Sequence, residues 1–209
     1  MQGFFAQTVK IALCYNKNMK IITTPNPKLR AKSQKVHQMT PEIKNLIVSM
    51  RKASLDWEKK HPHELSAAMA APQLGENYRI IIVRDDLEDK NNNTFTALIN
   101  PEVIRTEGKI VKDFEGCLSV PSIYGKVSRP RKVKIKAWTE DGHEVRIKAD
   151  DYLARVLMHE IDHLDGILFI DHIKDDSKAF YYLDNKDGEL HPLDYDTKIK
   201  DNPKLWGDD

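Results

Sequence analysis

Residues 150–166 read DDYLARVLMHEIDHLDG, and this stretch decides more about the fold than any other. Its apolar residues recur at helical spacing and a glycine closes it, so it predicts a helix that begins near Asp150 or Asp151 and ends at Gly166. The apolar face of this helix carries Leu153, Val156, Leu157, Ile161 and Leu164. We expect it to be the central helix of the protein.

The segments that precede this helix predict the rest of the fold. Thr40 is a favourable N-cap and Pro41 a favourable first helical residue, and apolar residues follow at helical spacing as far as Lys60. β-branched runs, or alternation of apolar and polar residues, predict strands at residues 78–83, 94–100, 133–137 and 145–147. This order predicts an α+β fold in which mostly antiparallel strands pack around the central C-terminal helix.

Length and composition bound the domain organisation. The 209 residues suit one domain, and 33 Lys and Arg against 32 Asp and Glu give no global field for nucleic acid or a membrane surface. Two cysteines are too few for a disulfide scaffold, and no apolar run is long enough to cross a bilayer. We expect residues 1–18 to be an N-terminal extension, residues 19–173 the core domain, and residues 174–209 an irregular acidic tail.

The central helix contains His159-Glu160-Ile161-Asp162-His163. At about 100° per residue, the two histidines lie about 40° apart around the helix, so both imidazoles can bind one metal ion. Glu160 lies on the same side as His163 and can reach a water molecule at the metal without binding the metal itself. The motif therefore predicts two metal ligands and a candidate general base.

A catalytic metal site of this kind needs a third protein ligand and an open position. Downstream, the sequence offers Asp165, Asp171, His172 and Glu189. His172 follows His163 by nine residues, whereas the metzincin pattern requires six and an intervening glycine. The metzincin geometry is therefore not met.

Upstream, Cys117 offers a different third ligand. It lies within EGCLS at residues 115–119, just before Pro121, in a bend from which a thiolate can project. A lone cysteine is more often a small buried apolar residue. A thiolate with two imidazoles, however, suits divalent iron or zinc.

Three motifs now stand in order along the chain: SAAMAAPQ at residues 66–73, EGCLS at residues 115–119, and HEIDH at residues 159–163. In these motifs the chain resembles the peptide deformylases, whose patterns are Gly-x-Gly-hydrophobic-Ala-Ala-x-Gln, Glu-Gly-Cys-hydrophobic-Ser and His-Glu-x-x-His. The second and third patterns match at every defined position, whereas Ser66 and Ala68 replace both glycines of the first. The resemblance extends from Met19 to about Ile173 and implies that this part is the catalytic domain.

The resemblance implies removal of the N-formyl group from the initiator methionine of new polypeptides. It makes Cys117, His159 and His163 the ligands of one divalent metal ion, iron first, with zinc, nickel or cobalt left open by the ligand set. It also assigns the catalytic roles: the metal acidifies water, Glu160 takes the proton, and the oxyanion is stabilised by the Gln73 side chain and the Leu118 backbone N–H.

Substrate and partner expectations follow from the same resemblance. Ile123, Tyr124 and Val156 are candidates for the pocket of the methionine side chain, and Ser66 and Ala68 add side-chain volume where the substrate backbone should run. The expected partners are N-formylmethionyl nascent polypeptides, with no membrane and no direct nucleic-acid recognition. A transient ribosome contact is left open, although the acidic tail argues against a contact through that segment. The expected location is the bacterial cytoplasm, or an organelle if the source is eukaryotic.

Two other functions remain open at this point. The first is a zinc-dependent peptidase or amidase that uses the same helix on a different substrate. The second is a deformylase-like binding protein whose altered loop at residues 66–69 changes its specificity. Glu115 and Arg129 are likewise open, either as supporting contacts of the site or as solvated charges.

Overall fold

The computed structural model describes residues 19–61, 64–89, 91–184 and 186–207. The expected N-terminal extension, residues 1–18, lies outside this part. Across the described ranges, no helix is long and apolar enough to span a membrane.

The described residues form one seven-stranded sheet in which every pair of named strands is antiparallel. The order is β1-β2-β3-β4-β6-β7, and β5 pairs with β4 beside this path. The strands are β1 (Ala68–Ala70), β2 (Ile80–Arg84), β3 (Phe95–Cys117), β4 (Val120–Trp138), β5 (Glu144–Asp150), β6 (Phe180–Leu183) and β7 (Leu190–Pro192).

Two longer helices accompany the sheet, α2 (Pro41–Glu58) and α3 (Asp151–Leu164). Both were predicted, and the Thr40 hydroxyl accepts a hydrogen bond from the Ile43 N–H at 3.4 Å, as expected of an N-cap. The short helical elements are η1 (Pro27–Arg30), η2 (Ala71–Leu74), η3 (Phe169–Ile173), α4 (Tyr195–Lys198) and α5 (Pro203–Trp206). The predicted α+β class, with antiparallel strands around the helix of the His-Glu-x-x-His motif, is confirmed.

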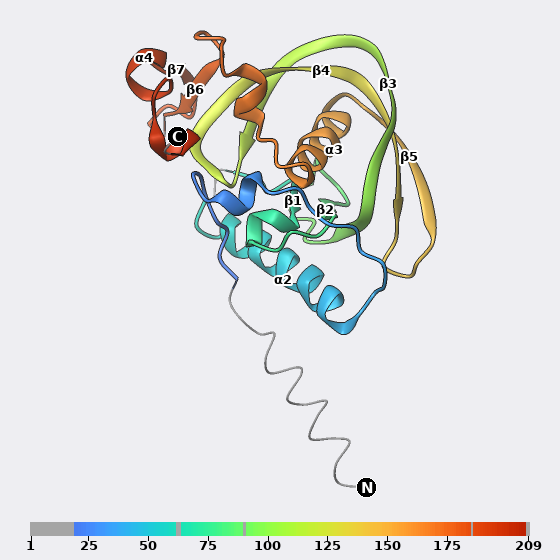
Figure 1. Cartoon of the computed structure of the whole chain (residues 1–209). Helices are drawn as coiled ribbons and strands as arrows, with labels where there is room; N and C mark the ends of the chain where they lie inside the picture. The colour runs from blue at the N-terminus through green and yellow to red at the C-terminus, as the bar shows by residue number, and fades with distance from the viewer. Residues whose placement is uncertain (1–18, 62–63, 90, 185, 208–209) are drawn as a thin grey trace, which may run out of the picture.

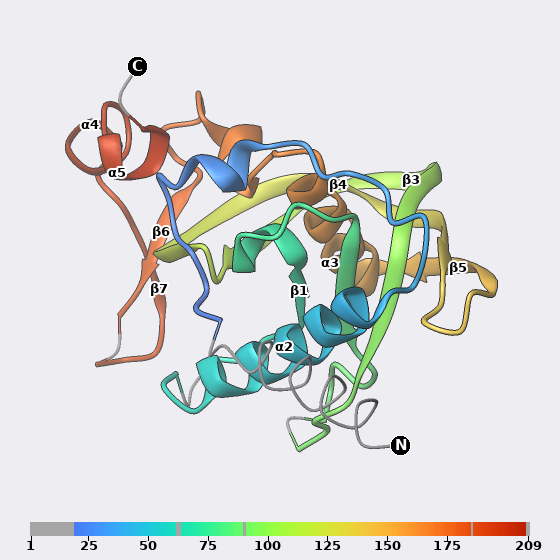
Figure 2. The same ribbon diagram turned by 60° about the horizontal axis from the view of Figure 1, so that its bottom comes forward.

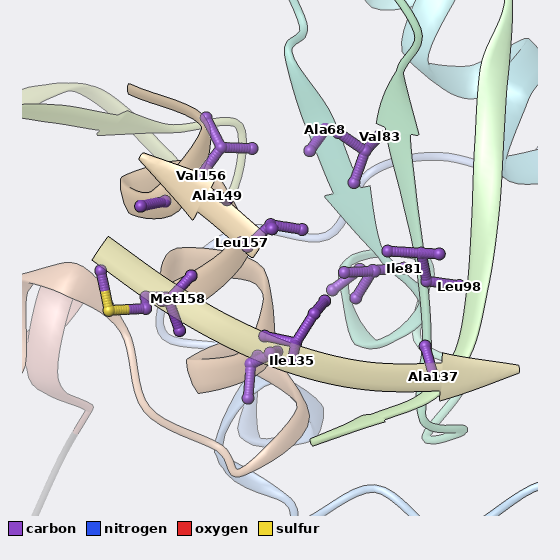
Figure 3. Packing of buried hydrophobic residues seen from close by; sticks show 14 of the residues in the cluster. Ala68, Ile81, Val83, Leu98, Ile135, Ala137, Ala149, Val156, Leu157 and Met158 are labelled. Carbon is purple, nitrogen blue, oxygen red and sulfur yellow. The ribbon is translucent and has the colours of Figure 1, made fainter. Parts of the chain in front are cut away.

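The two helices pack on opposite faces of β1 and β2. Ile81 and Val83 of β2 pack in the cluster around α3, which Figure 3 shows from close by. Ile80 and Ile82 of the same strand pack in a second cluster with α2. Because both faces are covered, all five residues of β2 are buried, and α3 is the central helix that the sequence predicts.

The long β3–β4 ribbon is the main feature that the sequence analysis missed. The strands predicted at residues 94–100 and 133–137 are only the ends of β3 and β4, which pair as far as Cys117 and Val120. Much of the intervening stretch of β3 is exposed, so it lacks the apolar alternation of a half-buried strand. Register shifts interrupt the pairing at several points, and the ribbon arches around α3 (Figure 1).

The expectation of an irregular tail is wrong for the described residues after 173. This segment contains β6, β7, α4 and α5, and β6 pairs with β4 through Tyr181 and Tyr124 (Figure 2). Phe180, Ile199 and Leu205 are buried in a third cluster against η3 and β4. The charged composition conceals this order because a few widely spaced apolar residues supply the packing.

Gly166 ends α3 as predicted. Its φ of +76° lies in the left-handed region that favours glycine. A Cβ at this position would lie 2.4 Å from the Arg30 carbonyl oxygen, so the close approach of two backbones also requires glycine. The N-terminal segment is thereby held against the end of α3, where the Ser33 N–H donates to the Leu164 carbonyl at 2.8 Å.

Candidate metal centre and active site

Three potential metal ligands from two elements meet beside the sheet. Cys117 is the last residue of β3, before the two-residue turn to β4, while His159 and His163 lie one turn apart on α3. Their ligand atoms all lie within 4.8 Å of one another, and Cys117 Sγ is 3.2 Å from His163 Nε2. We call these three residues the metal group.

The donor set of the metal group fits a divalent metal such as iron or zinc. A thiolate and two imidazoles are soft to intermediate donors, which such ions prefer. Burial holds the pKa of His163 well below its ordinary range, so this imidazole is in the neutral form that binds metals. Cys117 is only partly buried, which leaves one side of the group open to a cleft.

Three of the four downstream residues considered as ligands have other partners. His172 Nε2 lies 2.7 Å from Asp162 Oδ2, and Arg79 donates to Asp165 at 2.7 Å. Asp171 accepts from the Leu168 N–H at 2.7 Å. The fold therefore brings Cys117, and none of these three, to the two histidines.

Glu115 contacts the metal group through His159. Its carboxylate lies 2.9 Å from His159 Nδ1 and accepts three further hydrogen bonds, two from Arg129 at 2.8 and 3.0 Å and one from Arg155 at 2.7 Å. Burial alone would raise the pKa of Glu115, but His159 and Arg129 hold it well below its ordinary value. Holding Nδ1 in this way turns the other ring nitrogen, Nε2, toward the metal group.

The interpretation of Glu115 and Arg129 as solvated charges is wrong, since both are buried. Arg129 also donates to Asp162 at 2.6 Å, so the network reaches the residue just before His163. Arg155 was missed as a member of this network. Its position on the apolar helix gave a signal, because an arginine within a buried helical turn needs a buried partner.

Glu160 is the unpaired acid of the site. It is buried, and its Oε2 has no hydrogen-bond partner among the described residues. Burial raises the pKa of Glu160 to about 7, and the negative charge of Glu115 adds to the rise. A carboxyl group in this state can both accept and release a proton near neutral pH.

Gln73 has a fixed orientation next to the metal group. Its side-chain carbonyl Oε1 accepts the Ala70 N–H at 2.9 Å, so its NH₂ group must point the other way. That group lies 3.6 Å from Cys117 Sγ and 3.3 Å from Ser119 Oγ. Leu118 lies in the turn between β3 and β4, outside the strand ladder, and lines the same cleft.

A cleft of about 900 Å³ joins these groups. Every residue predicted from the sequence as catalytic or substrate-binding lines this cleft. Cys117 and His159 line it too, whereas His163 is buried and is not among the lining residues. Several further lining residues were not predicted, because they come from the end of α2, from α3 and from the C-terminal segment: Trp57, His61, Tyr152, Leu183 and Leu190.

The two residues in place of glycines adopt ordinary backbone conformations. Neither Ser66 nor Ala68 is among the described residues with positive φ, so the substitutions cause no backbone strain there. The Ser66 hydroxyl is hydrogen-bonded to that of Ser54 in α2, and the Ser66 N–H donates to Glu58 at 2.7 Å. The Ser66 side chain is thus engaged with α2, and Ala68 remains the residue that narrows the cleft.

Comparisons with known proteins agree with this site. Residues 18–179 match the family model of polypeptide deformylase. The chain belongs to this family. It is 41% identical over 170 residues to a peptide deformylase of Thermomicrobium roseum, covering 80% of this chain and 92% of that one. It is 43% identical to one of Halothermothrix orenii, covering 71% and 88%.

A solved structure supports the same assignment. The peptide deformylase of Synechococcus elongatus, in complex with actinonin, superposes with a TM-score of 0.64 at 34% identity, covering 73% of this chain and 76% of that one. The resemblance predicted from three motifs is confirmed, and the chain is an enzyme of a metal-dependent hydrolase family. This outcome speaks against both a generic zinc peptidase and a non-enzymatic binding protein.

Proposed function

We propose that this protein removes the formyl group from the N-terminal formylmethionine of newly made polypeptides. The observation that carries the proposal is the convergence of three groups on one cleft: the metal group, the unpaired Glu160 carboxyl and the oriented Gln73 amide. All of them lie within residues 19–173, which we propose as the catalytic domain.

The Glu160 side chain carries the proton through the reaction. A divalent metal, when held by Cys117, His159 and His163, would act as a Lewis acid that makes water a stronger nucleophile and polarises the formyl oxygen. Glu160 Oε2 accepts one proton from the attacking water, whose oxygen bonds to the formyl carbon. As the carbon–nitrogen bond breaks, Glu160 gives that proton to the leaving amine, and formate is released.

Two donors are placed to stabilise the negative charge that develops on the formyl oxygen. The Gln73 NH₂ group faces Cys117 because its carbonyl is held by Ala70. The Leu118 N–H lies in the turn next to Cys117. Fixed donors of this kind are already oriented before the reaction, so no reorganisation opposes it.

The methionine side chain is assigned to the apolar part of the cleft beside α3. Val156 lies one turn before Glu160 on α3, is almost fully buried and lines the cleft. Ile123 and Tyr124, on β4, line the same cleft. An unbranched apolar side chain fits between such walls without an unpaired polar group.

We further propose iron(II) as the physiological metal, with zinc, nickel and cobalt as ions that the same ligands accept. The substrates place the enzyme where formylated chains are synthesised, in the bacterial cytoplasm or in an organelle that initiates with formylmethionine. A direct ribosome contact is not required for this chemistry, and the tail of residues 174–209 has 10 acidic against 6 basic residues, which opposes binding to RNA.

The decisive experiment is an assay of formyl-Met-Ala and acetyl-Met-Ala on protein loaded separately with iron, nickel or zinc. We expect release of formate from the first peptide and little acetate from the second. A general peptidase would instead cleave the Met–Ala bond, and a binding protein would retain the formyl peptide unchanged.

The metal is tested by exposing the loaded forms to air. A thiolate against divalent iron in an open site is exposed to oxidation, so the iron form should lose activity while the nickel form keeps it. Equal loss from both forms would argue against Cys117 as a ligand of a redox-active ion.

A further inference from the structure

The C-terminal hairpin reaches the cleft, although the family match ends before it. The matched residues end at 179, whereas β6 begins at Phe180 and β7 ends at Pro192. Leu183 and Leu190 of this hairpin nevertheless line the same cleft as Cys117 and Glu160. The family match therefore gives this hairpin no role, and its position next to the site raises the question of one.

The two leucines line the cleft together, next to each other on the hairpin. They pair directly across the hairpin, with Leu183 opposite Leu190. Trp57 lies in the last turn of α2 and His61 just beyond its end, and their rings are stacked with centroids 4.1 Å apart. We call these four cleft-lining residues the outer groove; Figure 2 shows the β6–β7 hairpin extending beside the end of α2.

The hairpin is anchored to the site rather than loosely attached. Tyr181 pairs with Tyr124 of β4, and its ring packs edge-on against Phe114 of β3 at a centroid distance of 4.9 Å. The Lys126 ammonium lies over both rings, at 4.8 and 5.1 Å. These contacts fix the direction in which the two leucines project.

The outer groove offers mainly apolar contact. Its members present two leucine side chains and a stacked pair of rings, and all four are only partly exposed. Glu64, an acid that also lines the cleft, already accepts a hydrogen bond from the Tyr124 hydroxyl at 2.5 Å. Such a surface discriminates by burying apolar area and gives little binding to a polar side chain.

We propose that the outer groove is a specificity-determining subsite for an apolar side chain of the substrate, at a position downstream of the formylmethionine. The proposal rests on the proposed deformylase function, since it assumes that a peptide leaves the metal group through the cleft mouth. An extended peptide advances about 3.3 Å per residue, and we test its second and third residues after the methionine.

The test compares peptides that differ at one side chain. Formyl-Met-Ala-Xaa-Ala and formyl-Met-Ala-Ala-Xaa are assayed with leucine or serine as Xaa. Partial burial of a leucine should lower KM about fivefold relative to serine at one of the two positions, with kcat unchanged. The double variant Leu183→Ser/Leu190→Ser should bring this ratio close to one, and so should Trp57→Ala from the opposite side.

Tyr182→Ser is the matched control. Tyr182 lies in β6 between Tyr181 and Leu183, but it packs against His191 and is not among the cleft-lining residues. This variant should keep the wild-type ratio. A ratio near one for the wild type at both positions, or a ratio unchanged in both groove variants, would overturn the proposal.

Binding of the deformylated peptides Met-Ala-Leu-Ala and Met-Ala-Ser-Ala, measured by calorimetry, gives the same ratio without turnover. If no formyl peptide is hydrolysed by any metal-loaded form, the proposed function fails while calorimetry still decides on the groove. If hydrolysis is normal but leucine gives no advantage in either measurement, the groove fails alone. Because Trp57→Ala leaves the hairpin intact, the test does not depend on the folding of the double variant.

Discussion

The surroundings of the metal group and the outer groove use different interactions within one cleft. Around the metal group, buried polar and charged side chains fix one another's positions through hydrogen bonds and ion pairs. Glu115, for example, contacts His159, Arg129 and Arg155. In the outer groove, positions are set by strand pairing and by ring and leucine contacts. Catalysis requires the reacting atoms to be positioned within a fraction of an ångström. Binding of peptides with different side chains can instead rely on apolar contacts, which have no preferred direction.

This contrast also separates how each region should respond to substitution. A buried charge that loses its partner is strongly unfavourable, so changes around the metal group should affect stability and chemistry together. An apolar contact that is lost in the outer groove should change only the binding of one side chain. The predictions below test this separation.

The largest effect is expected from Glu160→Gln. The amide cannot accept the proton of the attacking water, so kcat for formyl-peptide hydrolysis should fall about 1,000-fold. The metal content should stay close to that of the wild type, because Glu160 is not a member of the metal group. Metal analysis and a rate measurement on the same sample check both statements, and near-normal turnover with full metal content would remove Glu160 from the role of base.

Glu115→Gln should come next, with a loss of stability of about 3 kcal/mol, because Arg129 and Arg155 lose their shared buried carboxylate. Metal affinity should fall at least about tenfold, since His159 loses the group that orients it. Chemical denaturation and metal competition measure the two effects.

Glu102→Gln is the control for this variant. Glu102 also pairs with two cations, Lys35 at 2.6 Å and Lys136 at 2.9 Å, but on the surface. Glu102→Gln should lower the free energy of unfolding by at most about 1 kcal/mol and leave metal affinity unchanged. Equal destabilisation by both variants would remove the contrast between buried and exposed carboxylates.

A smaller and more specific effect is expected in the pH dependence of the stability that Glu115 contributes. The pKa of Glu115 is lowered in the folded protein, so its contribution to stability is fully present above its ordinary value of 4.5 and is lost as the pH falls below it. The difference in the free energy of unfolding between the wild type and Glu115→Gln should therefore shrink progressively below about pH 4.5. Denaturation of the two proteins at a series of pH values measures this, and a constant difference down to pH 3 would contradict it.

How far the fold could be predicted depended on burial. The helices α2 and α3 and the ends of the long strands carry apolar residues at a regular spacing, and these were predicted. The exposed stretch of β3 between Arg105 and Glu107 pairs with β4 through its backbone, which leaves no apolar pattern to recognise. The hairpin of β6 and β7 was missed because its contacts are made by residues far away in sequence, such as Phe114 and Tyr124.

The candidate site divides in the same way. The metal group, Glu160, Gln73 and Leu118 belong to short motifs whose residue types reflect their chemistry, so their meeting in one cleft could be predicted. The outer groove is built from ordinary apolar side chains at the end of α2 and in the tail, which have no chemical signature. Only the tertiary structure shows that they line the cleft.

The smallest effect is expected where the chain departs from the family motif. The sequence predicts that Ser66→Gly/Ala68→Gly lowers KM by widening the cleft, but the Ser66 hydroxyl is hydrogen-bonded to Ser54 of α2. Ser66→Gly should therefore leave KM unchanged and cost about 1 kcal/mol of stability, as should Ser54→Ala, which breaks the same hydrogen bond. Ala68→Gly alone should lower KM by about twofold, since its methyl group lines the cleft. If Ser66→Gly lowers KM as much as Ala68→Gly does, the Ser66 side chain faces the substrate in solution, and both replaced glycines then shape the path of the peptide.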